Sequence, residues 1–126
     1  MRVFTTKWFA RYARQERIDD HSLCDAVARA ERGLVDADLG GDIIKQRVAR
    51  TGQGRSGGYR LLMVYRSGSL AVFLYGFAKS ERDNIDADDL KTLKEIGAAW
   101  LEAKDDNLQR AVEGGILKEV TYDNDK

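Results

Sequence analysis

The chain has 126 residues, of which 43% are hydrophobic and 33% charged, and this is the size and composition of one globular domain. No apolar run reaches the roughly 18 residues of a membrane-spanning helix, and the basic N-terminal segment lacks the apolar core of a secretory signal. One cysteine excludes an internal disulfide, and one histidine excludes the common zinc-ligand sets. We therefore expect a cytoplasmic protein without membrane contact, cofactor or bound metal.

The net charge of zero hides an uneven distribution of charge along the sequence. Residues 43–80 contain seven Lys and Arg residues and no acid, although the whole chain has 21 acidic residues. These seven residues are Lys45, Arg47, Arg50, Arg55, Arg60, Arg66 and Lys79. Such a segment predicts an electropositive face, which is typical of proteins that bind phosphate-rich or acidic partners. The alternative is a solvated sheet face whose charges pair with the flanking acids.

The N-terminal third predicts a short strand at residues 3–5 and then two helices. Thr5 or Thr6 can cap the first helix, and Asp19 or Asp20 can cap the second, because their side-chain oxygens accept hydrogen bonds from first-turn amides. Apolar residues of the second helix recur every three or four positions, which predicts a buried stripe. The members of this stripe are Leu23, Val27, Ala30 and Leu34.

After a polar turn, the apolar period changes to two, which predicts a strand at residues 43–50. A glycine-rich loop at residues 51–58 separates it from two nearly continuous apolar strands at residues 59–66 and 70–79. Such apolar strands are typical of the middle of a sheet that helices cover.

The C-terminal third begins with a helix that Asp86 or Asp88 opens, and Gly97 lies in its apolar stripe, where we expect close packing. A shorter amphipathic stretch and a possible late strand follow. The order of elements, β-α-α-β-β-β-α, indicates an α+β fold. We divide the chain into a domain at residues 1–103 and a C-terminal extension at residues 104–126.

Two motifs point to other chemistry but lack its context. Residues 52–57 match the GxGxxG pattern of dinucleotide-binding loops, yet a strand follows them where that site needs a helix. We favour a hairpin loop whose glycines allow close approach to a backbone. His21 and Cys24 are spaced like a Cys/His nucleophile pair on a helix. Cys24 adjoins the apolar stripe, however, so packing explains it better.

Basic residues on neighbouring strands predict a phosphate-binding site. Strand alternation places Lys45 and Arg47 on one face, about 7 Å apart, and Arg60 can lie across the hairpin from them. Fixed cations can stabilise the transition state of phosphoryl transfer without a metal. Aromatic side chains on the same strands offer surfaces for base stacking, although core packing explains at least two of them. These are Tyr59, Tyr65 and Tyr75.

The chain resembles the RelE/ParE superfamily of bacterial type II toxins over roughly residues 2–103, and most closely its HigB-like branch of RelE-type mRNA interferases. The pattern K-x-R-x-A-x-x-G-x-G-x-x-G-G-x-R at residues 45–60 carries this resemblance, together with K-x-E at residues 79–81. The resemblance implies a RelE-like α+β fold. In this fold a mainly antiparallel sheet of about four strands is flanked by N-terminal helices and a C-terminal helix.

The resemblance also implies an activity, in which a toxin enters the ribosome and cuts mRNA under translation. The ribose 2′-hydroxyl attacks the adjacent phosphate, leaving a 2′,3′-cyclic phosphate and a 5′-hydroxyl without a metal. The resemblance assigns catalytic roles to Lys45, Arg47, Arg60, Lys79 and Arg82. The residues expected to contact RNA or the ribosome are Arg50, Arg55, Arg66 and Tyr75. The implied partners are a cognate antitoxin, the ribosome and mRNA, with operator DNA reached only through the antitoxin.

Two positions depart from the RelE pattern. Ser80 stands where RelE carries an arginine after the last strand, with Arg82 two residues further on, and Asp86 stands where RelE has a catalytic tyrosine. Two rival functions therefore stay open. One is a ParE-like toxin that binds DNA gyrase without chemistry, and the other is a degenerate toxin that acts with its antitoxin as a DNA-binding co-repressor.

Overall fold

The structure is a computed structural model that describes residues 1–50, 58–82 and 84–122. Its strands are β1 (Arg2–Thr6), β2 (Ala37–Asp38), β3 (Ile43–Val48), β4 (Tyr59–Arg66), β5 (Leu70–Ala78) and β6 (Leu117–Val120). Its helices are α1 (Lys7–Glu16), α2 (Asp20–Glu31), α3 (Ala87–Glu102) and α4 (Asp105–Glu113).

The strands form one sheet in the order β2-β3-β4-β5-β1-β6. Only the β1–β5 pair is parallel among the pairings of the described residues, and the others are antiparallel. The predicted α+β fold with a mainly antiparallel sheet is therefore confirmed. The expected count of about four strands was too low, because the two-residue β2 and the late strand β6 add one strand at each edge.

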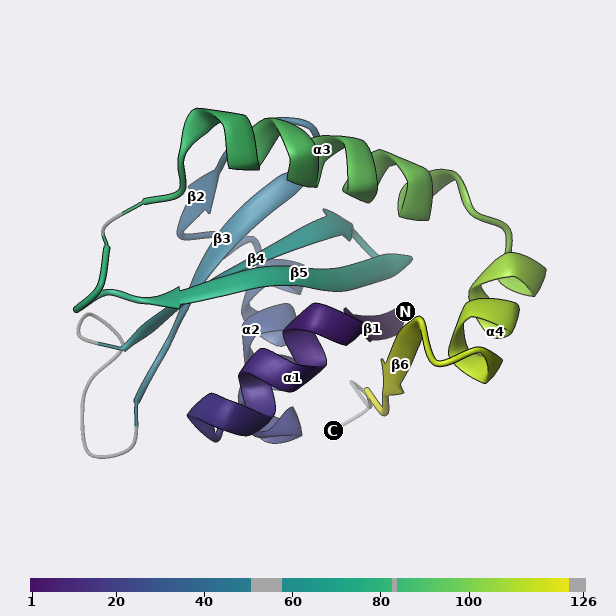
Figure 1. The fold of residues 1–126 in the computed structure, drawn as a ribbon, viewed down its shortest axis with the longest axis horizontal. Coiled ribbons are helices and arrows are strands. Elements are labelled where there is room, and N and C mark those ends of the chain that lie inside the picture. The colour runs from purple at the N-terminus through teal and green to yellow at the C-terminus, as the bar shows by residue number, and fades with distance from the viewer. Residues whose placement is uncertain (51–57, 83, 123–126) are drawn as a thin grey trace.

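Helices cover both faces of this sheet (Figure 1). On one face, α1 and α2 bury Phe9 and Val27 against apolar residues of β3, β4 and β5. On the other face, α3 and α4 bury Leu101 and Leu108 against alternate residues of the same strands. The central strands are apolar along both faces for this reason, as their sequences predicted.

The two N-terminal helices begin where the sequence predicts. The Thr6 hydroxyl accepts a hydrogen bond of 3.2 Å from the amide of Phe9, and the Asp19 carboxylate accepts one of 2.9 Å from the amide of Ser22. The predicted stripe of the second helix was wrong at its last member. Because α2 ends at Glu31, Leu34 lies beyond the helix and is 55% exposed.

The long helix α3 lies close to the sheet at Gly97, as predicted. A Cβ atom at this buried glycine would come within 3.2 Å of the side chains of Ile43 and Val64. Glycine therefore allows α3 to contact β3 and β4 at the end of the sheet that carries these two residues. Toward the other end of β3 and β4, the same face carries Lys45, Arg47 and Arg60.

The segment after α3 contributes to the same core. Leu108 and Ala111 of α4 and Leu117 of β6 are buried, and β6 pairs with β1 at the outer edge of the sheet. The division after residue 103 coincides with the turn between α3 and α4, and it stays a prediction about which part folds by itself.

Truncation after residue 103 is expected to unfold the protein. It removes the buried side chains of Leu108, Leu117 and Val120, each of which contributes about 1.5–3 kcal/mol. Their combined loss approaches the total stability of about 5–15 kcal/mol that is typical of a domain. Urea denaturation followed by circular dichroism tests this, with Glu113→Ala on the exposed side of α4 as the control. A cooperative transition for residues 1–103 at an unchanged midpoint would contradict the expectation.

Candidate functional site

Basic side chains of β3 and β4 meet on the face of the sheet that α3 also contacts. Alternation places Lys45 and Arg47 on the same face as Ile43, which packs in the α3-side core. The register sets Arg47 directly opposite Arg60 of β4, and Lys45 opposite Leu62. The predicted arrangement across the hairpin is therefore confirmed. We call Lys45, Arg47 and Arg60 the cation cluster.

Exposure differs among the three members of the cation cluster. Arg47 is exposed and Lys45 is half-buried, whereas Arg60 is only 6% exposed. The burial of Arg60 differs from the exposed position that is usual for a charged residue on an electropositive face. It lies on a central strand between Arg47 and the buried Phe77 of β5, and its side chain does not lack an interaction partner. Lys45 and Arg47 thus form the accessible part of the cation cluster, and Arg60 forms its buried part.

Lys79 and Arg82 follow the last residue of β5, at the same end of the sheet as Arg60. The amide of Lys79 donates a hydrogen bond of 3.0 Å to the carbonyl of Gly58, two residues before Arg60, and the amide of Arg82 donates one of 3.3 Å to the carbonyl of Ala78. Both residues are exposed. The backbone therefore brings these two predicted site residues to the end of β4 and β5 that borders the cation cluster.

The structure does not bring the other predicted basic residues to the cation cluster. The guanidinium of Arg50 lies 5.6 Å from the ring centre of Tyr59, which packs in the core on the α1–α2 face. Arg66 lies at the opposite end of β4 from Arg60, where its Nη1 donates a hydrogen bond of 3.4 Å to the carbonyl of Leu101. Arg55 lies outside the described residues.

Comparison with protein families decides the class of this protein. The model of the RelE toxin of the RelE/RelB toxin–antitoxin system matches residues 1–120. The chain belongs to the RelE toxin family. Comparison with curated proteins gives no match. The family match includes α4 and β6, whereas the resemblance in the sequence alone ended near residue 103.

Membership in the RelE toxin family implies an antitoxin as the partner class. Among the described residues, no helix combines the length and apolar character needed to cross a bilayer. In the same part of the chain, no three His, Cys, Asp or Glu side chains gather as the ligands of a metal ion would.

Of the three tyrosines that this RelE-family chain carries on β4 and β5, only one lies on the face of the cation cluster. Tyr59 and Tyr65 pack on the α1–α2 face, and their hydroxyls donate to the carboxylates of Glu16 and Glu31. Burial and these carboxylates raise the pKa of Tyr59 and raise the pKa of Tyr65 to about 12. Both phenols therefore stay protonated at neutral pH and have structural roles, as predicted for two of the three.

Tyr75 lies on the same face as the cation cluster, next to an apolar groove. It is opposite Leu62 in the sheet, and its ring stacks on Trp8 of α1 at a centroid distance of 4.8 Å. The groove has a volume of about 460 Å³, and Trp8, Trp100 and Ile116 are among its lining residues. Nothing in the sequence indicates that Trp8 borders Tyr75, because the contact joins a helix to a strand far along the chain.

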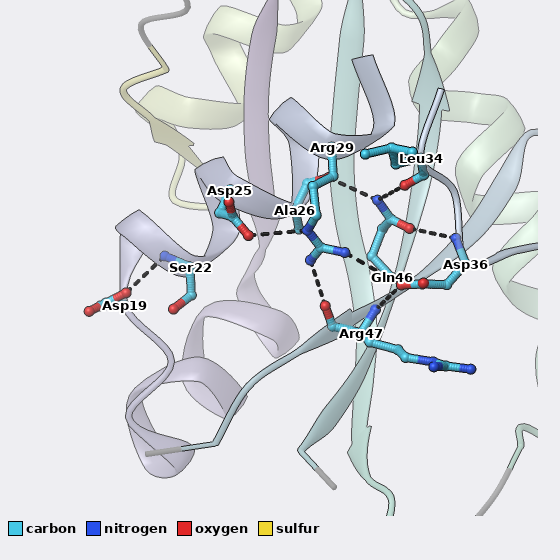
Figure 2. A network of polar contacts seen from close by, with 9 residues as sticks. All are labelled: Asp19, Ser22, Asp25, Ala26, Arg29, Leu34, Asp36, Gln46 and Arg47. Carbon is cyan, nitrogen blue, oxygen red and sulfur yellow. Dashed lines mark hydrogen bonds and ion pairs between the residues drawn. The ribbon is translucent and has the colours of Figure 1, made fainter. Parts of the chain in front are cut away.

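The sequence reasoning also missed a polar network on the opposite face of β3. The buried Gln46 side chain donates hydrogen bonds of 2.9 Å and 3.1 Å to the carbonyls of Ala26 and Leu34, and it accepts one of 2.9 Å from the amide of Asp36. Figure 2 shows that Arg29 and Asp36 continue this network to the backbone of Arg47. A polar residue at an inward position of a strand was the available signal.

The Cys/His alternative finds no support in the structure. The Cys24 thiol donates a hydrogen bond of 3.4 Å to the carbonyl of Thr121, and burial raises its pKa. A thiol with a raised pKa is a poor nucleophile at neutral pH. His21 is exposed on the first turn of α2. The GxGxxG match lies outside the described residues.

Proposed function

We propose that this RelE-family toxin is a ribosome-dependent endoribonuclease that cuts mRNA under translation. The observation that carries the proposal is the cation cluster, in which Lys45, Arg47 and Arg60 share one face of two adjacent strands. Two cations about 7 Å apart on a strand match the spacing of neighbouring phosphates. Cations held by a sheet need little reorganisation when negative charge develops, and this is the main source of catalysis in such sites.

The proposed reaction is an internal phosphoryl transfer. The 2′-oxygen forms a bond to the adjacent phosphorus and loses its proton, while the bond from phosphorus to the 5′-oxygen breaks and that oxygen gains a proton. Arg47 and Arg60 stabilise the charge on the phosphate, because a planar guanidinium donates several hydrogen bonds in a fork that matches phosphate oxygens. Lys45 and Lys79 are the members of the predicted set that can exchange protons, and Arg82 adds positive charge beside the leaving oxygen.

The proposed activity also implies contacts with RNA, the ribosome and an antitoxin. Arg50, Arg55, Arg66 and Tyr75 stay predicted contacts for RNA or the ribosome, although Arg50 and Arg66 then contact surfaces away from the cation cluster. We propose a place in the HigB-like branch, a cytoplasmic location, a cognate antitoxin that silences the toxin, and contact with operator DNA only through that antitoxin.

Primer extension on cellular mRNA after brief induction of the toxin tests this function. Cuts at fixed positions within translated codons are expected, and they should disappear with Lys45→Ala at equal expression. Intact mRNA together with DNA damage would overturn the proposal in favour of a gyrase-binding toxin. Intact mRNA without growth arrest, together with operator binding in the presence of the antitoxin, would favour a co-repressor.

Cleavage is expected to proceed without a metal bound to the toxin. In the proposed reaction Lys and Arg side chains carry the charge stabilisation that a divalent ion supplies in other nucleases. Because magnesium also holds ribosomes together, elemental analysis of the purified, active toxin is the cleaner measurement. A stoichiometric transition metal in that preparation would contradict the expectation.

A further inference from the structure

One ion pair binds both backbone polar groups of Arg47 (Figure 2). Arg29 of α2 donates from Nη2 to the carbonyl oxygen of Arg47 at 2.5 Å, and its Nη1 lies 3.5 Å from Oδ2 of Asp36. The same Oδ2 accepts a hydrogen bond of 2.6 Å from the amide of Arg47. We call these two side chains the Arg29–Asp36 pair.

On the β2 side of β3, no strand of the described residues pairs with Arg47, and the Arg29–Asp36 pair lies there instead. Backbone groups of alternate β3 residues point toward β2, and those of Ile43 bond to the backbone of Leu39 and Gly40. The register of β2 with β3 ends at Lys45, so that β2 offers no partner to Arg47. Side-chain groups of the Arg29–Asp36 pair therefore bind an amide and a carbonyl that a longer β2 would have bound.

The backbone direction at Arg47 also determines how Arg47 and Arg60 face each other. Because the amide and carbonyl of Arg47 point away from β4, Arg47 and Arg60 form a non-hydrogen-bonded antiparallel pair. Side chains are closest in such pairs, and like charges that lie opposite each other repel. Strand β3 thus places Arg47 directly opposite another cationic residue at a position where β2 no longer pairs with it.

Arg29 is suited to hold the Arg47 backbone in one place. Its side chain is 6% exposed and its Nε forms a second ion pair with Asp25, at 3.1 Å from Oδ2. A buried guanidinium with all its polar neighbours in place is held in one geometry, and moving it is costly. In Figure 2 the Arg47 side chain points away from the Arg29–Asp36 pair, so the pair holds the backbone without neutralising the Arg47 guanidinium.

We propose that the Arg29–Asp36 pair is a positioning device of the cation cluster, which holds the Arg47 backbone so that its guanidinium stays beside Arg60 over the scissile phosphate. This proposal rests on the proposed nuclease function. Asp36 and Arg29 are positioning residues, since neither is placed in contact with RNA. Displacement of a reacting or stabilising group by about 1 Å can cost about 100-fold in rate, so loss of the pair should be visible in cleavage.

Asp36→Ala and Asp25→Ala form a matched test of the positioning role. Each variant removes one carboxylate partner of Arg29 and leaves the other, so the buried guanidinium keeps an ion pair and the fold is retained. Of these two carboxylates, only that of Asp36 contacts the Arg47 backbone. In single-turnover cleavage on ribosomes, Asp36→Ala should be about 10- to 100-fold slower at an unchanged half-saturating ribosome concentration. Asp25→Ala should stay within about 2-fold of the parent protein.

The double variant Asp36→Ala/Arg47→Ala separates positioning from general destabilisation. If Asp36 acts through Arg47, its removal should slow the Arg47→Ala protein by no more than about 2-fold. Asp36→Asn retains an oxygen acceptor for the Arg47 amide and should recover part of the rate. Equal effects of Asp36→Ala and Asp25→Ala, or additive effects in the double variant, would overturn the proposal.

Hydrogen exchange provides a readout that needs no cleavage. In Asp36→Ala, exchange at the amide of Arg47, followed by NMR, should be at least about 10-fold faster, while the amide of Gln46, which points toward β4, keeps its protection. Unchanged protection at Arg47 would overturn the positioning role whatever the activity. A parent protein that cuts no mRNA would overturn the nuclease function, and the exchange result would still decide whether the pair orders Arg47.

Discussion

Replacing Lys45 or Arg60 by alanine is expected to abolish growth arrest on induction of the toxin. Each substitution removes a positive charge from the face where Arg47 and Arg60 lie opposite each other. Loss of one preorganised charge at a phosphoryl transition state costs about 100- to 1,000-fold in rate. Growth curves at matched expression, together with single-turnover cleavage on ribosomes, measure the effect.

The two substitutions need different controls because their burial differs. Lys45 is half-buried and its loss should leave the unfolding temperature nearly unchanged. Arg60 is 6% exposed, so alanine also removes packing there, and Arg60→Met, which retains volume without charge, separates the two effects. Lys118→Ala, an exposed lysine on β6, serves as a matched charge control. Full toxicity of both Lys45→Ala and Arg60→Met would remove the cation cluster from the mechanism.

Gly58→Ala is expected to abolish activity and lower the free energy of unfolding by about 3 kcal/mol. A Cβ atom at this position would penetrate the carbonyl oxygen of Val48 and lie 2.7 Å from the amide nitrogen of Arg50. These are backbone atoms and cannot rotate away, so β3 and β4 would have to separate. Separation at this point displaces Arg47 from Arg60 and disturbs the hydrogen bond from the Lys79 amide to the Gly58 carbonyl.

Urea denaturation and ribosome-based cleavage test Gly58→Ala directly. Gly114→Ala is the control, because a Cβ there would approach nothing closer than 3.3 Å and the backbone is already helical. That variant should change the free energy of unfolding by less than about 1 kcal/mol. A Gly58→Ala protein with parental stability and toxicity would show that the close approach of β3 and β4 is dispensable.

The sequence by itself determined the elements and the faces of the cationic strands. A period of two in residues 43–48 was enough to place Lys45 and Arg47 together, because strand alternation is a property of the local backbone. Thr6 and Asp19 predicted the starts of α1 and α2 for the same reason, since a cap binds amides within its own first turn. Gly97 marked the close contact of α3 with the sheet because no other residue fits there without displacing Ile43 and Val64.

Only the tertiary structure decided which basic residues share a site and what supports them. The sequence grouped Arg50, Arg60 and Arg66 by charge, but strand order buried Arg60, turned Arg50 to the other face and placed Arg66 at the far end of β4. The contact of Arg29 with Arg47 joins residues 18 positions apart on different elements. Periodicity and capping report contacts within one element, whereas such pairings depend on how helices and strands pack against each other.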